Sequence, residues 1–201
     1  MGVSIVPCII CEAPAGGARS KAMMKALLAI SRFIDACNEA VGRAAAWLVL
    51  VTVLISAGNA ASRYALGMSS NAWLEIQWYL FAAIFLLGAG YTLKRNGHVR
   101  VDVLAGRLSA RRQAWIDITG GALFLLPMVI IIAYHSWPMF MQSFVGREVS
   151  ADAGGLVRWP VKLLIPAGFA LLALQGASEI IKRIAFLRGD IDDPRERRPD
   201  H

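Results

Sequence analysis

The sequence predicts an all-α integral membrane protein with four transmembrane helices and with both termini in the cytoplasm. Three observations lead to this fold class. Of the 201 residues, 57% are hydrophobic and only 17% are charged, whereas soluble domains are about 45–50% apolar and about 25% charged. The apolar residues gather in four blocks of about 20 residues, the length that crosses a bilayer. The Lys and Arg residues lie between and outside these blocks, in alternating numbers.

The distribution of positive charge sets the expected orientation of the spans. The predicted spans are residues 44–63, 72–93, 114–136 and 161–181. The segments around them carry 17 Lys and Arg residues on one side of the membrane and 4 on the other. Because Lys and Arg collect in cytoplasmic segments, we expect both termini and the middle connection inside. The net charge of +7 therefore indicates membrane topology and contact with lipids, with no nucleic-acid partner.

The remaining segments divide the chain around a single membrane domain. Residues 1–22 are expected to be a disordered or over-extended N-terminus, because their apolar residues precede their basic ones, the reverse of a secretory signal. Residues 23–185 form the predicted four-span domain, and residues 186–201 a charged cytoplasmic tail. Cys8 and Cys11 have the spacing of a metal or redox pair, but no second Cys pair completes such a site.

Two amphipathic helices are expected on the cytoplasmic membrane surface. Residues 25–42 place apolar side chains at three- and four-residue steps along one helical face. Such a helix can lie along the membrane surface, and the alternative is a simple extension of the first span. A second surface helix is expected between the second and third spans, where Val101, Leu104 and Leu108 share a face.

Prolines indicate where the spans end and bend. Pro138 and Pro160 bracket the expected outer segment, which is the longest on that side of the membrane. Pro160 suits the first turn of the fourth span, where a missing N–H costs little. Pro127 and Pro166 lie inside spans and are expected to kink them.

No pattern in the sequence predicts an enzyme or a cofactor. Three acidic residues of the spans, Glu75, Asp117 and Glu179, all lie near span ends. A carrier that acts alone usually needs a polar site at mid-depth, and none is evident. Gly and Ala residues in every span offer faces for close helix packing, which favours a larger membrane partner.

The basic turn after the second span holds a His and an Asp that could suggest a metal or acid/base site. His98 and Asp102 are four residues apart and can contact each other on a helix. A metal site would need further ligands, and none lies nearby in the sequence. With Lys94 and Arg95, they are expected to shape the inner corner between spans and to set the topology.

The stretch SRYALGMSSNAWLEIQWYLFAAIFLLGAGYTLKRNGHVRVDVL, residues 62–104, has an ordered set of features. An Arg-Tyr pair ends the first span, a Trp and a Glu open the second, and a basic turn with His and Asp follows. In this order the set resembles the DctQ-type small membrane subunit of tripartite ATP-independent periplasmic (TRAP) transporters. Residues 154–176 also resemble the last span of one branch of that family. The residues that carry the resemblance are Arg63, Tyr64, Trp73, Glu75, Lys94, Arg95, His98 and Asp102.

Two features depart from the family pattern. Many members carry two acids in a row where this chain has Glu75-Ile76, and residues 1–22 have no family counterpart. The resemblance implies a scaffold subunit in a bacterial inner membrane. It implies two partners, a large DctM-type membrane subunit and a periplasmic DctP-type solute-binding protein. It also implies import of an organic acid by sodium symport, with substrate and sodium held elsewhere.

Two other functions remain open at this point, a four-helix carrier or channel acting alone and a membrane anchor for another complex. Two contacts are also expected as hypotheses. Arg63 could pair with Glu75 at the outer ends of the first two spans, and the alternative is that each is solvated independently. The outer segment, residues 138–160, could help to dock the binding protein.

Overall fold

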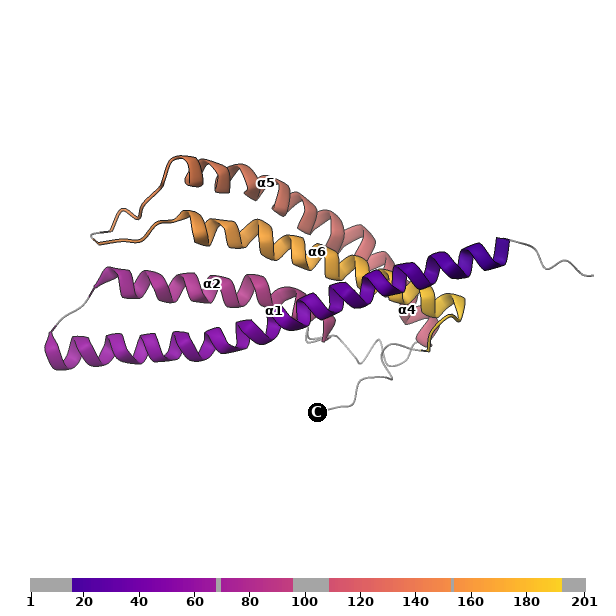
Figure 1. Cartoon of the computed structure of the whole chain (residues 1–201), viewed down its shortest axis with the longest axis horizontal. Helices are drawn as coiled ribbons and strands as arrows, with labels where there is room; N and C mark the ends of the chain where they lie inside the picture. The colour runs from indigo at the N-terminus through magenta and orange to yellow at the C-terminus, as the bar shows by residue number, and fades with distance from the viewer. Residues whose placement is uncertain (1–15, 68–69, 96–108, 153, 193–201) are drawn as a thin grey trace, which may run out of the picture.

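In a computed structural model of the chain, the described residues are 16–67, 70–95, 109–152 and 154–192. Four helical stretches are long and apolar enough to cross a membrane, which confirms the predicted four-span, all-α fold. The only β pairing within the described ranges is a single antiparallel bridge between Val149 and Val157. The helices are α1 (Gly16–Leu66), α2 (Asn71–Lys94), α4 (Ala110–Gly120), the π-helix η1 (Gly121–Leu125), α5 (Leu126–Val145) and α6 (Trp159–Arg188) (Figure 1).

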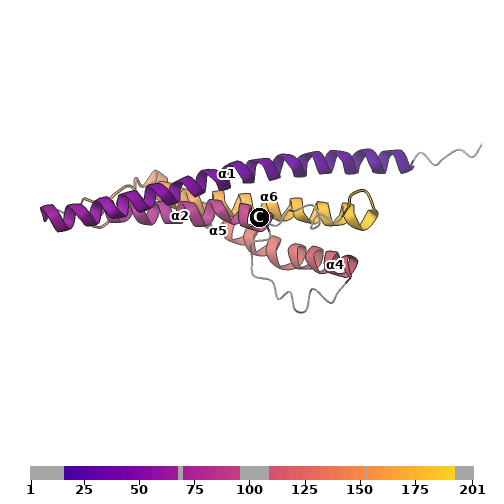
Figure 2. The ribbon, with the colours of Figure 1, turned by 90° about the horizontal axis from the view of Figure 1, so that it is seen from below.

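The helices form three layers, with α1 on one side, α2 and α6 in the middle and α5 on the other side (Figure 2). Helix α1 packs against α2 and α6, and α5 packs against α6. The α1–α2 and α5–α6 connections lie at the same end of the molecule (Figure 1), which the charge pattern assigns to the outside. Helices α2 and α6 therefore run in the same direction, from the outer end to the inner end.

Helix α1 differs from the predicted pair of a surface helix and a separate span. Residues 25–42 continue into the first span without a break, within one helix of 51 residues. The prediction of a separate helix is therefore wrong, and residues 25–42 extend the helix of the first span, as the alternative proposed. No proline lies between Gly16 and Leu66, so nothing stops the helix where the apolar block begins. At 1.5 Å per residue the helix is about 75 Å long, well beyond the thickness of a bilayer.

The third span is one helical run, Ala110–Val145, with a π-helical turn inside it. Pro127 cannot donate to the carbonyl of Leu123, and the π turn at Gly121–Leu125 stands where that bond is lost. Pro138 was predicted to begin the outer segment, but it lies inside α5. Prolines are tolerated inside membrane helices, so apolar residues beyond Pro138 extend the helix to Val145. The outer segment is correspondingly shorter, residues 146–158.

Helix α6 begins where its sequence predicts and continues past the predicted end of the span at residue 181 to Arg188. Pro160 lies in the first turn, as expected. Gly189 caps the C-terminus in the left-handed conformation with φ of 79°, and the Asp190 N–H donates to the carbonyl of Ala185 at 3.0 Å. This pairing of a left-handed glycine with a returning N–H is a common helix stop. The second predicted surface helix lies outside the described residues.

Candidate functional site: an interhelical polar network and an outer-hairpin contact

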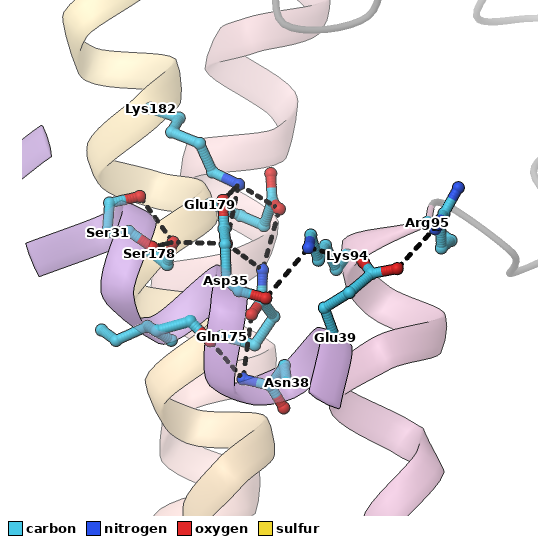
Figure 3. Close-up of polar contacts among 11 residues, drawn as sticks. Ser31, Asp35, Asn38, Glu39, Lys94, Arg95, Gln175, Ser178, Glu179 and Lys182 are labelled. Carbon is cyan, nitrogen blue, oxygen red and sulfur yellow. Dashed lines mark hydrogen bonds and ion pairs between the residues drawn. The ribbon is translucent and has the colours of Figure 1, made fainter. Parts of the chain in front are cut away.

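The inner half of α1 turns several polar side chains toward the other helices. Ser31 and Asn38 are buried, whereas Ile30 and Phe33 are 54% and 71% exposed. This is the reverse of a helix lying on a membrane surface, which buries its apolar face in the lipid. It matches a helix that turns Ser31 and Asn38 toward partner helices and leaves Ile30 and Phe33 facing outward. The polar face positions the network shown in Figure 3.

Helix α6 supplies the matching polar side chains. The Gln175 amide is fully buried; its nitrogen donates to Asp35 Oδ1 at 2.8 Å, and its oxygen accepts from Asn38 Nδ2 at 3.0 Å. The Ser178 hydroxyl contacts the Ser31 hydroxyl at 2.6 Å and donates to Asp35 Oδ1 at 3.1 Å. A polar group buried without a partner is costly, so these complementary bonds fix α1 against α6 in one register.

A lysine bridges two carboxylates of this network, one on each helix. Lys182 Nζ lies 3.1 Å from Asp35 Oδ2 on α1 and 2.6 Å from Glu179 Oε1 on its own helix. Gln175 also donates to Glu179, at 3.1 Å. The three charged side chains are only partly exposed, so solvent screens them less than surface pairs. Each carboxylate of the group therefore has the lysine as a neighbour of opposite charge.

Helix α2 joins the network at its inner end through two residues of the family motif. Lys94 Nζ lies 2.7 Å from Glu39 Oε2 and donates to the carbonyl of Asp35 at 2.9 Å. Arg95 Nη2 lies 2.9 Å from Glu39 Oε1, and its guanidinium stacks over the Tyr91 ring. Glu39 therefore holds Lys94, the last residue of α2, and the next residue, Arg95, against α1.

A separate ion pair ties the start of the third span to α6. Arg183 is buried, and its Nε lies 3.2 Å from Asp117 Oδ2. With Lys182 and Arg183 on adjacent positions, α6 reaches α1 on one side and α4 on the other. Among the described residues, no group of three or more His, Cys, Asp or Glu could hold a metal ion.

The outer end has a contact of a different kind, between α2 and the α5–α6 connection. Glu75 is only 4% exposed, and its Oε2 accepts a hydrogen bond from the Leu156 backbone N–H at 2.6 Å. One turn further along α2, the Tyr79 hydroxyl donates to the Val157 carbonyl at 3.3 Å. Consecutive residues of the connection are thus held by side chains on one face of α2.

The other motif residues have separate surroundings. Arg63 is exposed and does not pair with Glu75, so that hypothesis is not supported, and Tyr64 is 97% exposed. Trp73 lines a groove of about 570 Å³ between the outer ends of α1 and α2. His98 and Asp102 lie outside the described residues.

Sequence reasoning missed the α1 side of the network. The prediction of a surface helix over residues 25–42 would place polar residues such as Asp35 and Asn38 in water, away from Gln175. A usable signal existed, because two polar stripes have helical spacing. Ser31, Asp35 and Asn38 form one, and Gln175, Ser178 and Lys182 form the other. Two such stripes on apolar helices indicate a shared polar interface.

Comparison with known proteins identifies the family. The family model described as tripartite ATP-independent periplasmic transporters, DctQ component, matches residues 52–186. The C4-dicarboxylate TRAP transporter small permease protein DctQ of Pseudomonas aeruginosa is 32% identical over 108 residues, which cover 52% of this chain and 50% of that protein. The match thus spans about half the length of the curated relative. No solved structure was found to match the chain. The chain belongs to the DctQ family of TRAP transporter small permease subunits and is a multi-pass protein of the bacterial inner membrane.

Proposed function

We propose that the chain is the non-catalytic scaffold subunit of a TRAP-type secondary transporter. It would act with a large DctM-type membrane subunit and a periplasmic DctP-type binding protein to import an organic acid with a sodium gradient. The observation that carries the proposal is the family match across residues 52–186, which includes the outer part of α1 and almost all of α6.

The inner network supports a stationary role for this subunit. Asp35, Glu39 and Glu179 each lie beside a lysine or arginine of the same chain. A sodium or carboxylate site within a membrane needs unsatisfied oxygens or donors aimed at the ion. Here the carboxylates bind cationic side chains of the same chain across three helices, and Asn38 Oδ1 alone is a buried oxygen of the network without a partner. The paired carboxylates favour a rigid support over a moving carrier.

The substrate proposal comes from the relative. That protein is named as part of a C4-dicarboxylate transporter, so C4-dicarboxylates are the first organic acids to test. The outer hairpin, which we define as residues 146–158, is the proposed docking surface for the binding protein. It replaces the longer outer segment, residues 138–160, because Pro138 to Val145 are helical.

Reconstitution in liposomes tests the function. The chain is co-purified with the large membrane subunit of its own transporter, and uptake of a labelled C4-dicarboxylate is measured with the cognate binding protein outside. We expect uptake only when all three proteins and an inward sodium gradient are present, and none with a potassium gradient. Uptake by this chain alone would instead establish a stand-alone carrier. Failure to co-purify with the large subunit would contradict the scaffold role.

A further inference from the structure

We infer that Glu75 and Tyr79 are positioning residues that hold the outer hairpin against α2 and so orient it toward the periplasmic binding protein. The part of the inference that concerns the binding protein rests on the proposed function. The part that concerns the hairpin rests on contacts within this chain alone.

First, the side chains of α2 and the backbone of the hairpin offer complementary hydrogen-bonding groups. Glu75 offers an acceptor to the N–H of Leu156, and Tyr79 offers a donor to the carbonyl of Val157. The two side chains are four residues apart, so they lie on one face of the helix. They therefore bind the backbone of the hairpin from two successive turns, which fixes both its position and its direction along α2.

The second step is the internal order of the hairpin. Val149 and Val157 form an antiparallel bridge. The Ser150 N–H donates to the Leu156 carbonyl, and the Arg158 N–H donates to the Glu148 carbonyl, each at 2.9 Å. These bonds make the hairpin one unit, so an anchor at Leu156 and Val157 sets the orientation of its exposed tip.

The third step is the burial of the Glu75 charge. A carboxylate at the outer end of a span would be solvated if the hairpin lay elsewhere, yet this one is nearly inaccessible. A hydrogen bond from a backbone N–H to a carboxylate is stronger than one between neutral groups. If the hairpin moved away from α2, Glu75 and the Leu156 N–H would lose this hydrogen bond to each other. The docked position of the hairpin is therefore favoured over a released one.

The test uses the complete transporter complex with Cys8, Cys11 and Cys37 replaced and a spin label at position 151, in the exposed part of the hairpin. Label mobility and the affinity of the purified binding protein for the complex are measured together. In Glu75→Ala we expect higher mobility and about three- to tenfold weaker binding. Glu75→Gln keeps an acceptor oxygen and should retain most of both properties. Tyr79→Phe removes only the second anchor and should have a smaller effect. Leu74→Ala, at an exposed neighbouring position, is the matched control.

The possible outcomes distinguish the anchoring of the hairpin from its effect on docking of the binding protein. Unchanged label mobility in both Glu75→Ala and Tyr79→Phe would overturn the anchoring role. Higher mobility with unchanged affinity would overturn the link between hairpin orientation and docking. A wild-type complex that does not bind the binding protein at all would contradict the proposed function instead. If Glu75→Ala reduces the yield of the complex, Tyr79→Phe still tests the anchor in a folded protein.

Discussion

Gly168 of α6 lies so close to α2 that a methyl group on its Cα would stand 2.7 Å from the carbonyl oxygen of Leu86. One turn further in, a methyl group on Gly90 would overlap the buried Asn38 Oδ1 and lie 3.5 Å from the Leu171 carbonyl. The two parallel helices thus approach through a glycine from each. Close backbone approach at small residues is a principal source of helix association in lipid.

Gly168→Ala should weaken this contact. The added methyl group meets backbone atoms that cannot rotate away, and overpacking of this kind costs about 1–3 kcal/mol. The free energy of unfolding in mixed detergent measures the change. Gly88→Ala is the matched control, because nothing lies within 4 Å of its added methyl group. An equal effect of the two substitutions would contradict the close-packing account.

Asp35→Asn should loosen α1 from α6. The substitution removes the charge that faces Lys182 and changes the acceptor for Gln175 and Ser178, and a disturbed buried polar group costs about 1–3 kcal/mol. A double-mutant cycle with Lys182→Met measures the coupling between Asp35 and Lys182. Lys25→Gln, on the exposed face of the same helix, is the control. A coupling near zero would show that the ion pair contributes nothing to packing.

Charge reversal tests the contact between α1 and the inner end of α2. Glu39→Lys places a third cation beside Lys94 and Arg95, so the yield of folded protein should fall several-fold. Exchanging both partners, Glu39→Lys with Lys94→Glu, should restore part of the yield, because the ion pair is then formed in reverse. Fluorescence-detected size-exclusion chromatography of membrane extracts gives the yield. No recovery in the double variant would argue against a direct pair.

The outer hairpin should loosen in acid. Lys162 forms an ion pair with Glu148, and its hydrogen bond holds the pKa of the Glu148 carboxyl below its usual value of 4.5. A carboxyl group whose pKa is lower in the folded than in the unfolded protein stabilises the folded hairpin at pH values above its unfolded-state pKa. This contribution is lost as the pH falls through the folded-state pKa. The mobility of a spin label at position 151 should therefore rise below about pH 4.5. Glu148→Gln should show higher mobility already at neutral pH and less change in acid.

The four spans could be predicted from the sequence because the length and apolar composition of a segment are almost sufficient to identify a transmembrane helix. Their contacts could not. Glu75 binds the backbone N–H of Leu156, 81 residues further along, and a backbone donor has no signature in the sequence. Pro138 was predicted to end its helix because proline breaks helices in water, whereas lipid keeps backbone hydrogen bonds formed around it.

The inner half of α1 could be predicted from the sequence only in part. Its periodicity correctly predicts a helix with one polar and one apolar face, but periodicity cannot say which face meets the protein. In water Asp35 would face outward, and in this protein it faces Gln175 and Lys182. That choice depends on α6, more than a hundred residues later in the chain.

The separation of Asp35 and α6 along the chain also means that the two are synthesised at different times. A ribosome makes α1 before α6, so Asp35 is synthesised well before Gln175, Ser178 and Lys182. Until α6 inserts, the Asp35 carboxylate lacks these three partners. A nascent chain truncated before α6 should therefore be recognisably unfinished to the quality-control proteases of the membrane. Helix α6 thus supplies the polar partners of a helix that was made long before it.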